Sequence, residues 1–144
     1  MKQMTAKNVT MGDAAVDGLL GGVTAGIAMA VYLVAVNVIG GEGFAVLTRF
    51  DPNGASPIVG TLLHLAVSGV YGAAFGIVAN WVRRFNVPMW VVGLIFGIGL
   101  FALAQLVVLP TSRSALAGIP ILHFGIAHII YGFVLGWIVN RMRS

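Results

Sequence analysis

The sequence has 144 residues, of which 59% are hydrophobic and 8% are charged, and its formal net charge is +4. Soluble domains carry about 25% charged residues, so this composition excludes a water-soluble globular protein, while the length favours a single domain over residues 1–144. The absence of cysteine excludes disulfides, thiolate metal sites and cysteine nucleophiles.

The first part of the chain, residues 1–14, is polar and has no apolar core of the kind found in a signal peptide. We therefore expect the hydrophobic segment that follows to be retained as a membrane helix. Asp13 and Asp17 fall in the first turns of this helix, where the helix dipole favours a carboxylate.

Four long uncharged runs separate the short segments that hold all of the charged residues. Each run exceeds the ~20 residues that cross the ~30 Å hydrocarbon core of a bilayer. The sequence therefore predicts an all-α integral membrane protein, a four-transmembrane-helix bundle surrounded by lipid. The expected helices span residues 15–39, 58–81, 88–109 and 120–141.

The connections between these helices predict how they are arranged. The longest, residues 40–57, has apolar residues at a spacing of three, which favours a short helix on the bilayer surface, and then a turn at residues 51–54. The spaced apolar residues are Phe44, Leu47 and Phe50. The connection at residues 83–88 is so short that helices 58–81 and 88–109 should be antiparallel neighbours.

The distribution of lysine and arginine predicts the orientation in the membrane. Six of these residues fall on one side and only Arg49 and Arg113 on the other, so the positive-inside rule places both termini in the cytoplasm, residues 40–57 outside it, and the protein in the inner membrane. The six are Lys2, Lys7, Arg83, Arg84, Arg141 and Arg143. Since they do not cluster on one polar face, we expect no nucleic-acid partner.

An internal repeat relates Leu62–Arg83 to Leu122–Arg143, sixty residues later. The identical pairs are Leu62/Leu122, Tyr71/Tyr131, Gly72/Gly132, Gly76/Gly136, Asn80/Asn140 and Arg83/Arg143. A weaker echo relates Gly18-Leu19-x2-Gly22 to Gly93-Leu94-x2-Gly97. Together they predict two tandem helical hairpins in a parallel repeat, related by an axis along the membrane normal.

Glycines spaced four residues apart give each predicted helix a face of small side chains. Such faces let helices pack closely within a bundle or against another subunit, and a homo-oligomer is one such arrangement. The glycines concerned are Gly22, Gly26, Gly72, Gly76, Gly93, Gly97, Gly132 and Gly136.

Three histidines are the titratable groups well inside the uncharged runs, and intramembrane ionisable residues suggest function. His64 and His123 are expected at similar depth and could ligate a b-type haem. However, the repeat aligns His64 with Phe124, so their helix faces would differ by about 100°. The alternatives are interfacial histidines bonded to loop carbonyls or water, and a contact with a quinone or a lipid headgroup.

His128 is the most deeply placed histidine, and Tyr131 lies three residues further along the same helix face. Tyr71 holds the equivalent place in the other copy of the repeat. These side chains could bind a quinone carbonyl or relay a proton. Alternatively, they could join helices through hydrogen bonds worth ~0.6 kcal/mol each.

No motif requires an enzymatic reaction, and no acidic residue lies in mid-membrane, which argues against a proton-coupled exporter. The leading hypothesis is a non-catalytic accessory subunit of a respiratory or photosynthetic electron-transfer complex, with other membrane-protein subunits as partners. The first alternative is a redox protein that binds haem b or quinone. The second is a small homo-oligomeric transporter or channel with a polar path formed by His128, Gln105 and the tyrosines.

Overall fold

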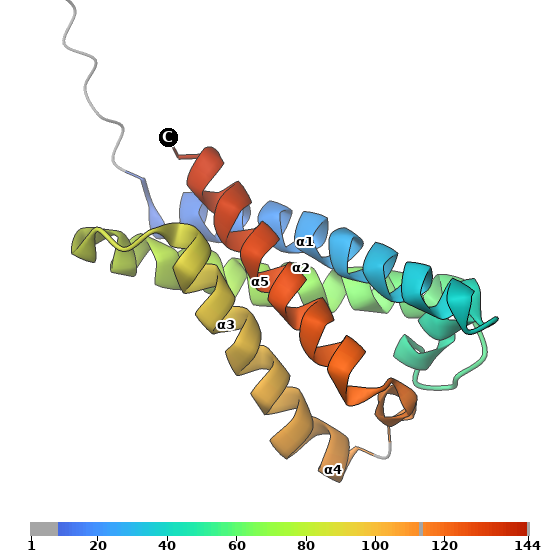
Figure 1. The fold of residues 1–144 in the computed structure, drawn as a ribbon. Helices are drawn as coiled ribbons and strands as arrows, with labels where there is room; N and C mark the ends of the chain where they lie inside the picture. Colours follow the sequence, from blue (N-terminus) through green and yellow to red (C-terminus); the bar gives the residue numbers. More distant parts are fainter. Residues whose placement is uncertain (1–8, 113, 144) are drawn as a thin grey trace, which may run out of the picture.

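The computed structural model describes residues 9–112 and 114–143, and every regular element in this part of the chain is helical (Figure 1). Within these residues, four helical segments are long and apolar enough to cross a membrane: Met11–Ile39, Pro57–Phe85, Met89–Thr111 and Ile121–Arg141. The predicted all-α fold with four such helices is therefore confirmed. Lys2, Lys7 and Arg113, which entered the orientation prediction, lie outside the described residues.

The first two long helices begin at clear capping signals. Helix α1 (Met11–Ile39) starts four residues before its predicted boundary because the Thr10 side chain accepts from the Asp13 amide while the Asp13 carboxylate accepts from the Thr10 amide. Helix α2 (Pro57–Val82) starts after Ser56, whose side chain accepts from the Val59 amide.

The third membrane-crossing segment is irregular. Helix α3 (Met89–Leu103) continues into the π-helical turn η3 (Ala104–Val108) and the short helix α4 (Leu109–Thr111). Pro110 lies just beyond the π turn. Its ring has no N–H to donate to the carbonyl four residues earlier and would clash with it, which accounts for the loss of the regular α pattern here. After η4 (Ala115–Gly118), α5 (Ile121–Arg141) completes the bundle.

Helices α1 and α2 make the most extensive contact in the protein, through glycine. A Cβ atom added to Gly22 would lie 2.7 Å from the Cα of Gly72, and one added to Gly18 would lie 2.8 Å from the Cα of Gly76. Side chains at these positions would therefore force the two backbones apart.

Helices α3 and α5 form the second close contact in the same way. A Cβ added to Gly93 would lie 2.9 Å from the Cα of Gly136, and one added to Gly97 would lie 3.0 Å from the Cα of Gly132. Helix α1 also contacts α5, which joins the two helix pairs.

Helices α2 and α3 touch only slightly, although the tight turn η2 (Arg83–Phe85) connects them. Figure 1 shows α3 diverging from α2 beyond this turn. The prediction that these helices are packed neighbours is therefore wrong. The physical reason is that Gly93 and Gly97 face α5, where close backbone contact is available, and α3 follows that surface.

The connection between α1 and α2 contains the 3-10 helix η1 (Gly43–Phe50). Its Val46 and Leu47 are buried and it contacts α1 and α2, whereas Phe44 is exposed. A short helix was expected in this segment, but it packs on the bundle instead of resting its apolar residues only on lipid.

The predicted turn after this helix is built around Asp51. Its carboxylate accepts hydrogen bonds from the amides of Asn53, Ala55 and Ser56 at 3.0, 3.2 and 3.0 Å. These bonds, led by the one from Asn53, hold the pKa of Asp51 below its usual range. The ionised side chain therefore closes the turn that aims α2 into the bundle.

At the opposite end of the bundle, Arg143 joins three helices. Its Nε donates to Asp17 of α1 at 2.9 Å, and its Nη1 donates to Asn80 of α2 at 3.0 Å. Asp17 is thus engaged in an ion pair with a side chain that is 5% exposed. Nearby, Arg83 donates to the Val139 carbonyl at 2.9 Å.

We predict that Gly72→Ala destabilises the bundle by about 1–3 kcal/mol, because the added methyl group would collide with the Gly18 carbonyl and the Cα of Gly22. Unfolding by SDS in mixed micelles, followed by circular dichroism, measures the loss. Gly99→Ala is the control, since a Cβ at Gly99 meets nothing within 4 Å. Equal stability of the two variants would contradict the assignment of backbone contact as a main source of stability.

Candidate functional site

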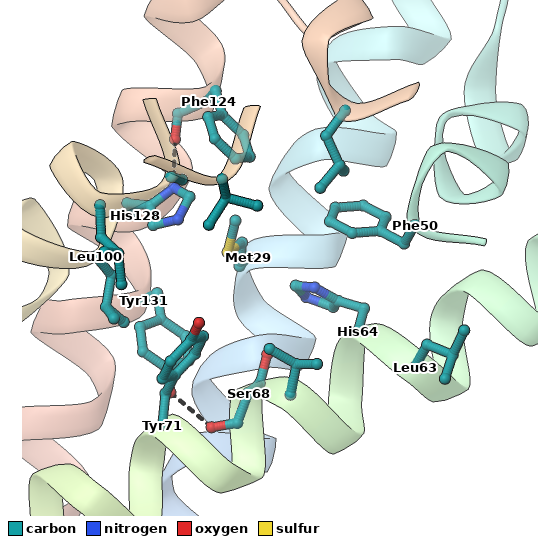
Figure 2. A pocket seen from close by; sticks show the side chains of 15 residues that line it. Met29, Phe50, Leu63, His64, Ser68, Tyr71, Leu100, Phe124, His128 and Tyr131 are labelled. Atoms are coloured by element: carbon teal, nitrogen blue, oxygen red, sulfur yellow. Dashed lines mark hydrogen bonds between the residues drawn. The ribbon is translucent and has the colours of Figure 1, made fainter. Parts of the chain in front are cut away.

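A cavity of about 350 Å³ lies at the centre of the bundle, and Figure 2 shows the side chains that line it. We call it the central cavity. Its polar lining comes from five residues of α2 and α5: His64, Ser68, Tyr71, His128 and Tyr131. Most of its remaining lining is aliphatic or aromatic, including Met29 of α1, Phe50 of η1 and Phe124 of α5.

The divergence of α2 from α3 leaves the central cavity bordered by side chains that are exposed on the outer surface of the bundle. Val67 of α2 is 51% exposed and Leu103 at the end of α3 is 42% exposed, and both also line the cavity. These helices are long and apolar enough to cross a membrane, and in a bilayer their exposed side would face lipid. In that setting the cavity would border the hydrocarbon region, and the π turn η3 contributes Ala104 and Val108 to its lining.

His64 and His128 line the cavity from different helices, and each is bonded to a backbone carbonyl. His64 Nε2 lies 3.0 Å from the carbonyl oxygen of Gly26, and His128 Nδ1 lies 2.8 Å from that of Phe124. Figure 2 shows the two rings entering from opposite sides, with Met29 between them. Both rings also pack on aromatic neighbours, His64 on Phe50 and His128 on Phe124, each with ring centroids 4.5 Å apart.

The two tyrosines have different environments. Tyr131 is 3% exposed, and its hydroxyl donates to the Ser68 carbonyl at 2.7 Å, which joins α5 to α2. Tyr71 is only partly buried, and its hydroxyl has no hydrogen-bond partner among the described residues. Figure 2 shows this hydroxyl pointing into the cavity. Tyr131 therefore has a structural bond, whereas Tyr71 has a polar group available to a ligand.

His123 does not belong to this site. Its Nδ1 lies 3.1 Å from the Tyr32 hydroxyl of α1, outside the set of residues that line the cavity. The structure thus offers no geometry for a haem held between His64 and His123, and brings His64 together with His128 instead. Gln105, considered for a polar path, is also absent from the lining.

Sequence reasoning missed Ser68, Met29 and Phe50 as lining residues. A signal for Ser68 was present, because the sixty-residue repeat aligns it with His128 and it lies one helical turn after His64. Met29 and Phe50 gave no such signal, since apolar residues of a membrane helix or loop carry no mark of the cavity that they border.

The chemistry available in the cavity is that of binding and proton exchange. All four carboxylates of the chain are engaged elsewhere: Asp13 in its capping box, Asp17 with Arg143, Glu42 with Arg49 and Asp51 with its turn. The described residues contain no group of three side chains suited to hold a metal ion. Imidazole and phenol groups, which accept or donate hydrogen bonds, are therefore its main reactive groups.

Comparisons with known proteins give a family and one distant relative. A family model described as "Family of unknown function (DUF6789)" matches residues 12–144. The lipoprotein signal peptidase of Moorella thermoacetica is 28% identical over 100 residues, which make up 69% of this chain and 58% of that protein. The chain thus spans less than two thirds of the length of that relative. No solved structure matches the chain significantly.

We predict that Tyr131→Phe lowers the free energy of unfolding by roughly 0.6 kcal/mol, and by no more than about 1.7 kcal/mol, because it removes one interhelical hydrogen bond inside the membrane. Tyr71→Phe is the matched control and should leave stability unchanged, since its hydroxyl has no partner among the described residues. SDS unfolding of both variants without added ligand makes the comparison. A larger loss for Tyr71→Phe than for Tyr131→Phe would contradict the assigned roles.

Proposed function

We propose that this chain, which belongs to the DUF6789 family of unknown function, binds a lipid-soluble quinone in the central cavity. The observation that carries this proposal is the gathering of His64, His128 and Tyr71 at one cavity, whose lining also includes the exposed side chains of Val67 and Leu103. A quinone has a polar ring and an apolar tail. The ring would lie among these side chains, while the tail would leave between α2 and α3.

The composition and size of the cavity support such a ligand. Small-molecule sites are commonly clefts of roughly 300–1,000 Å³ with mostly apolar walls and a few placed polar groups. The central cavity, at about 350 Å³, lies within this range. Polar and ionisable groups inside a membrane are costly, so their convergence on one cavity favours a ligand-binding role.

The similarity to a lipoprotein signal peptidase suggests an alternative, a peptidase acting on a lipid-linked substrate. We do not propose it, because the four carboxylates are already engaged outside the cavity and cysteine is absent. What the two proteins could share is access to a substrate from the bilayer.

We also propose that the bundle consists of two tandem hairpins in a parallel repeat. The glycine contacts support this arrangement, because Gly18 meets Gly72 and Gly76 in the way that Gly93 meets Gly132 and Gly136. The cavity lining follows the same sixty-residue relation. The paired lining positions are His64/Phe124, Ser68/His128 and Tyr71/Tyr131. The cavity would then lie at the interface between the repeats, where membrane proteins with internal repeats place ligands.

The orientation remains part of this proposal: an inner-membrane protein with both termini in the cytoplasm. Its support is the set of arginines at the end of the bundle where α2 and α5 finish, which includes Arg83, Arg84, Arg141 and Arg143. At this end Arg84 lies 4.1 Å from the centre of the Trp81 ring and Arg141 lies 5.1 Å from that of Trp137. Such pairs suit the membrane interface.

An accessory subunit of a larger electron-transfer complex is the second candidate function. The observation that favours it is the exposure of the third long segment, Met89–Thr111: 11% of its apolar 18-residue stretch is buried, compared with 39% of the corresponding stretch in each of the other three. A neighbouring subunit would cover this surface. The two candidates are compatible, because accessory subunits of such complexes could hold quinone beside the catalytic subunits. The transporter or channel alternative has no comparable observation in its favour.

We predict that His128→Asn weakens binding of decylubiquinol, a reduced quinone, to the purified protein in nanodiscs by about tenfold, the effect of one lost hydrogen bond of ~1.4 kcal/mol. Asparagine keeps the local structure, because its side-chain amide can donate to the carbonyl four residues earlier. Asn37 does this in α1, donating to the Leu33 carbonyl at 2.8 Å. Isothermal titration calorimetry measures the affinity.

His123→Asn is the matched control, since His123 lies outside the cavity and its replacement should leave the affinity unchanged. Failure of the unmodified protein to bind either decylubiquinol or decylubiquinone above empty nanodiscs would refute the proposed function. A reduced-minus-oxidised absorbance spectrum of the same sample tests the haem alternative. A b-type haem band that disappears in His64→Ala and His128→Ala would replace quinone with haem as the ligand.

For the accessory role, we predict that the chain extracted gently from its native membrane migrates in a particle far larger than 15.0 kDa, together with other subunits in fixed proportion. Native gel electrophoresis followed by mass spectrometry identifies them. A particle that contains only this chain would reject the accessory role, and its mass would give the size of the homo-oligomer.

A further inference from the structure

We infer, resting on the proposed function, that the central cavity binds the reduced hydroquinone in preference to the oxidised quinone. The two forms differ in the groups they offer. A quinone carries two carbonyl oxygens, which only accept hydrogen bonds, whereas a hydroquinone carries two hydroxyl groups, which can donate. The preference follows from how few hydrogen-bond donors in the cavity are free to bind a ligand.

Three of the five polar side chains in the cavity already donate their hydrogen to a backbone carbonyl of the protein. A backbone carbonyl can only accept, so the ring nitrogen facing it must carry the hydrogen. This places the proton of His64 on Nε2, toward Gly26, and that of His128 on Nδ1, toward Phe124. The Tyr131 hydroxyl likewise gives its proton to the Ser68 carbonyl.

An uncharged imidazole has a single N–H, so the second nitrogen of each ring has a lone pair and no hydrogen. Nδ1 of His64 and Nε2 of His128 are therefore acceptors, and neither has a partner among the described residues. Adding a second proton would place a positive charge inside the membrane, which is costly. The oxygen of Tyr131 also retains only accepting capacity.

The other two polar groups do not reverse this balance. Tyr71 and Ser68 carry hydroxyls that can donate or accept, so they adapt to either form of the ligand. The cavity thus offers three fixed acceptors and two adaptable groups. A quinone carbonyl placed against a histidine lone pair would make no hydrogen bond and would be repelled, while a hydroquinone hydroxyl would donate to it.

Selective binding of the reduced form changes the redox behaviour of the bound couple. Stabilising the product of a two-electron reduction raises its midpoint potential, by about 30 mV for each tenfold difference in affinity. The protein would therefore hold hydroquinone taken from the membrane pool, and the bound hydroquinone would be a weaker reductant than the free one.

The test compares decylubiquinol and decylubiquinone as ligands of the protein in nanodiscs, under argon, by isothermal titration calorimetry. We expect the reduced form to bind about tenfold more tightly, since one added hydrogen bond has roughly that effect. The midpoint potential of the bound couple, measured by redox titration, should be higher than that of the couple in empty nanodiscs.

His128→Asn should bring the two affinities closer together, because asparagine keeps the bond to the Phe124 carbonyl but lacks an acceptor at the position of Nε2. His123→Asn should leave the ratio unchanged. Equal affinities for the two forms, or tighter binding of the quinone, would overturn this inference while leaving the proposed function in place. Binding of neither form would refute the proposed function itself.

Discussion

Close contact between helix backbones at glycine is the interaction on which the rest of this structure depends. Lipid gives apolar helices no hydrophobic reason to associate, so packing must come from surfaces that fit. Gly22 against Gly72 and Gly97 against Gly132 bring α1 to α2 and α3 to α5 more closely than any side chain would allow. These two contacts divide the bundle into two tightly packed pairs, which α1 and α5 join.

The central cavity is a consequence of this division. Since α3 follows the glycine face of α5, it diverges from α2, and the space between them is lined by side chains such as Leu100 and Tyr71. The same geometry places His64 and His128 on facing helices around one volume.

Backbone carbonyls then determine the chemistry of the cavity. A histidine inside a membrane must satisfy at least one nitrogen, and here the carbonyls of Gly26 and Phe124 do so. Each bond decides which nitrogen keeps its hydrogen. Gly26 thereby has two roles: it lets α1 approach Ser68 of α2 closely, and its carbonyl accepts the hydrogen bond of His64 across the interface between α1 and α2.

The sequence by itself determined the four membrane-crossing helices and most of their ends, because an uncharged run of sufficient length has no other stable state in water or lipid. It also identified Tyr71, Tyr131, His64 and His128 as candidates. It could not decide which histidines meet, and it paired His64 with His123 because depth along a helix is readable from spacing. Rotation about the helix axis and the choice of packing partner are set by contacts between distant residues, such as Gly93 with Gly136. Only the tertiary structure, therefore, separated α2 from α3, turned His123 toward Tyr32 and left His64 and His128 to share a cavity.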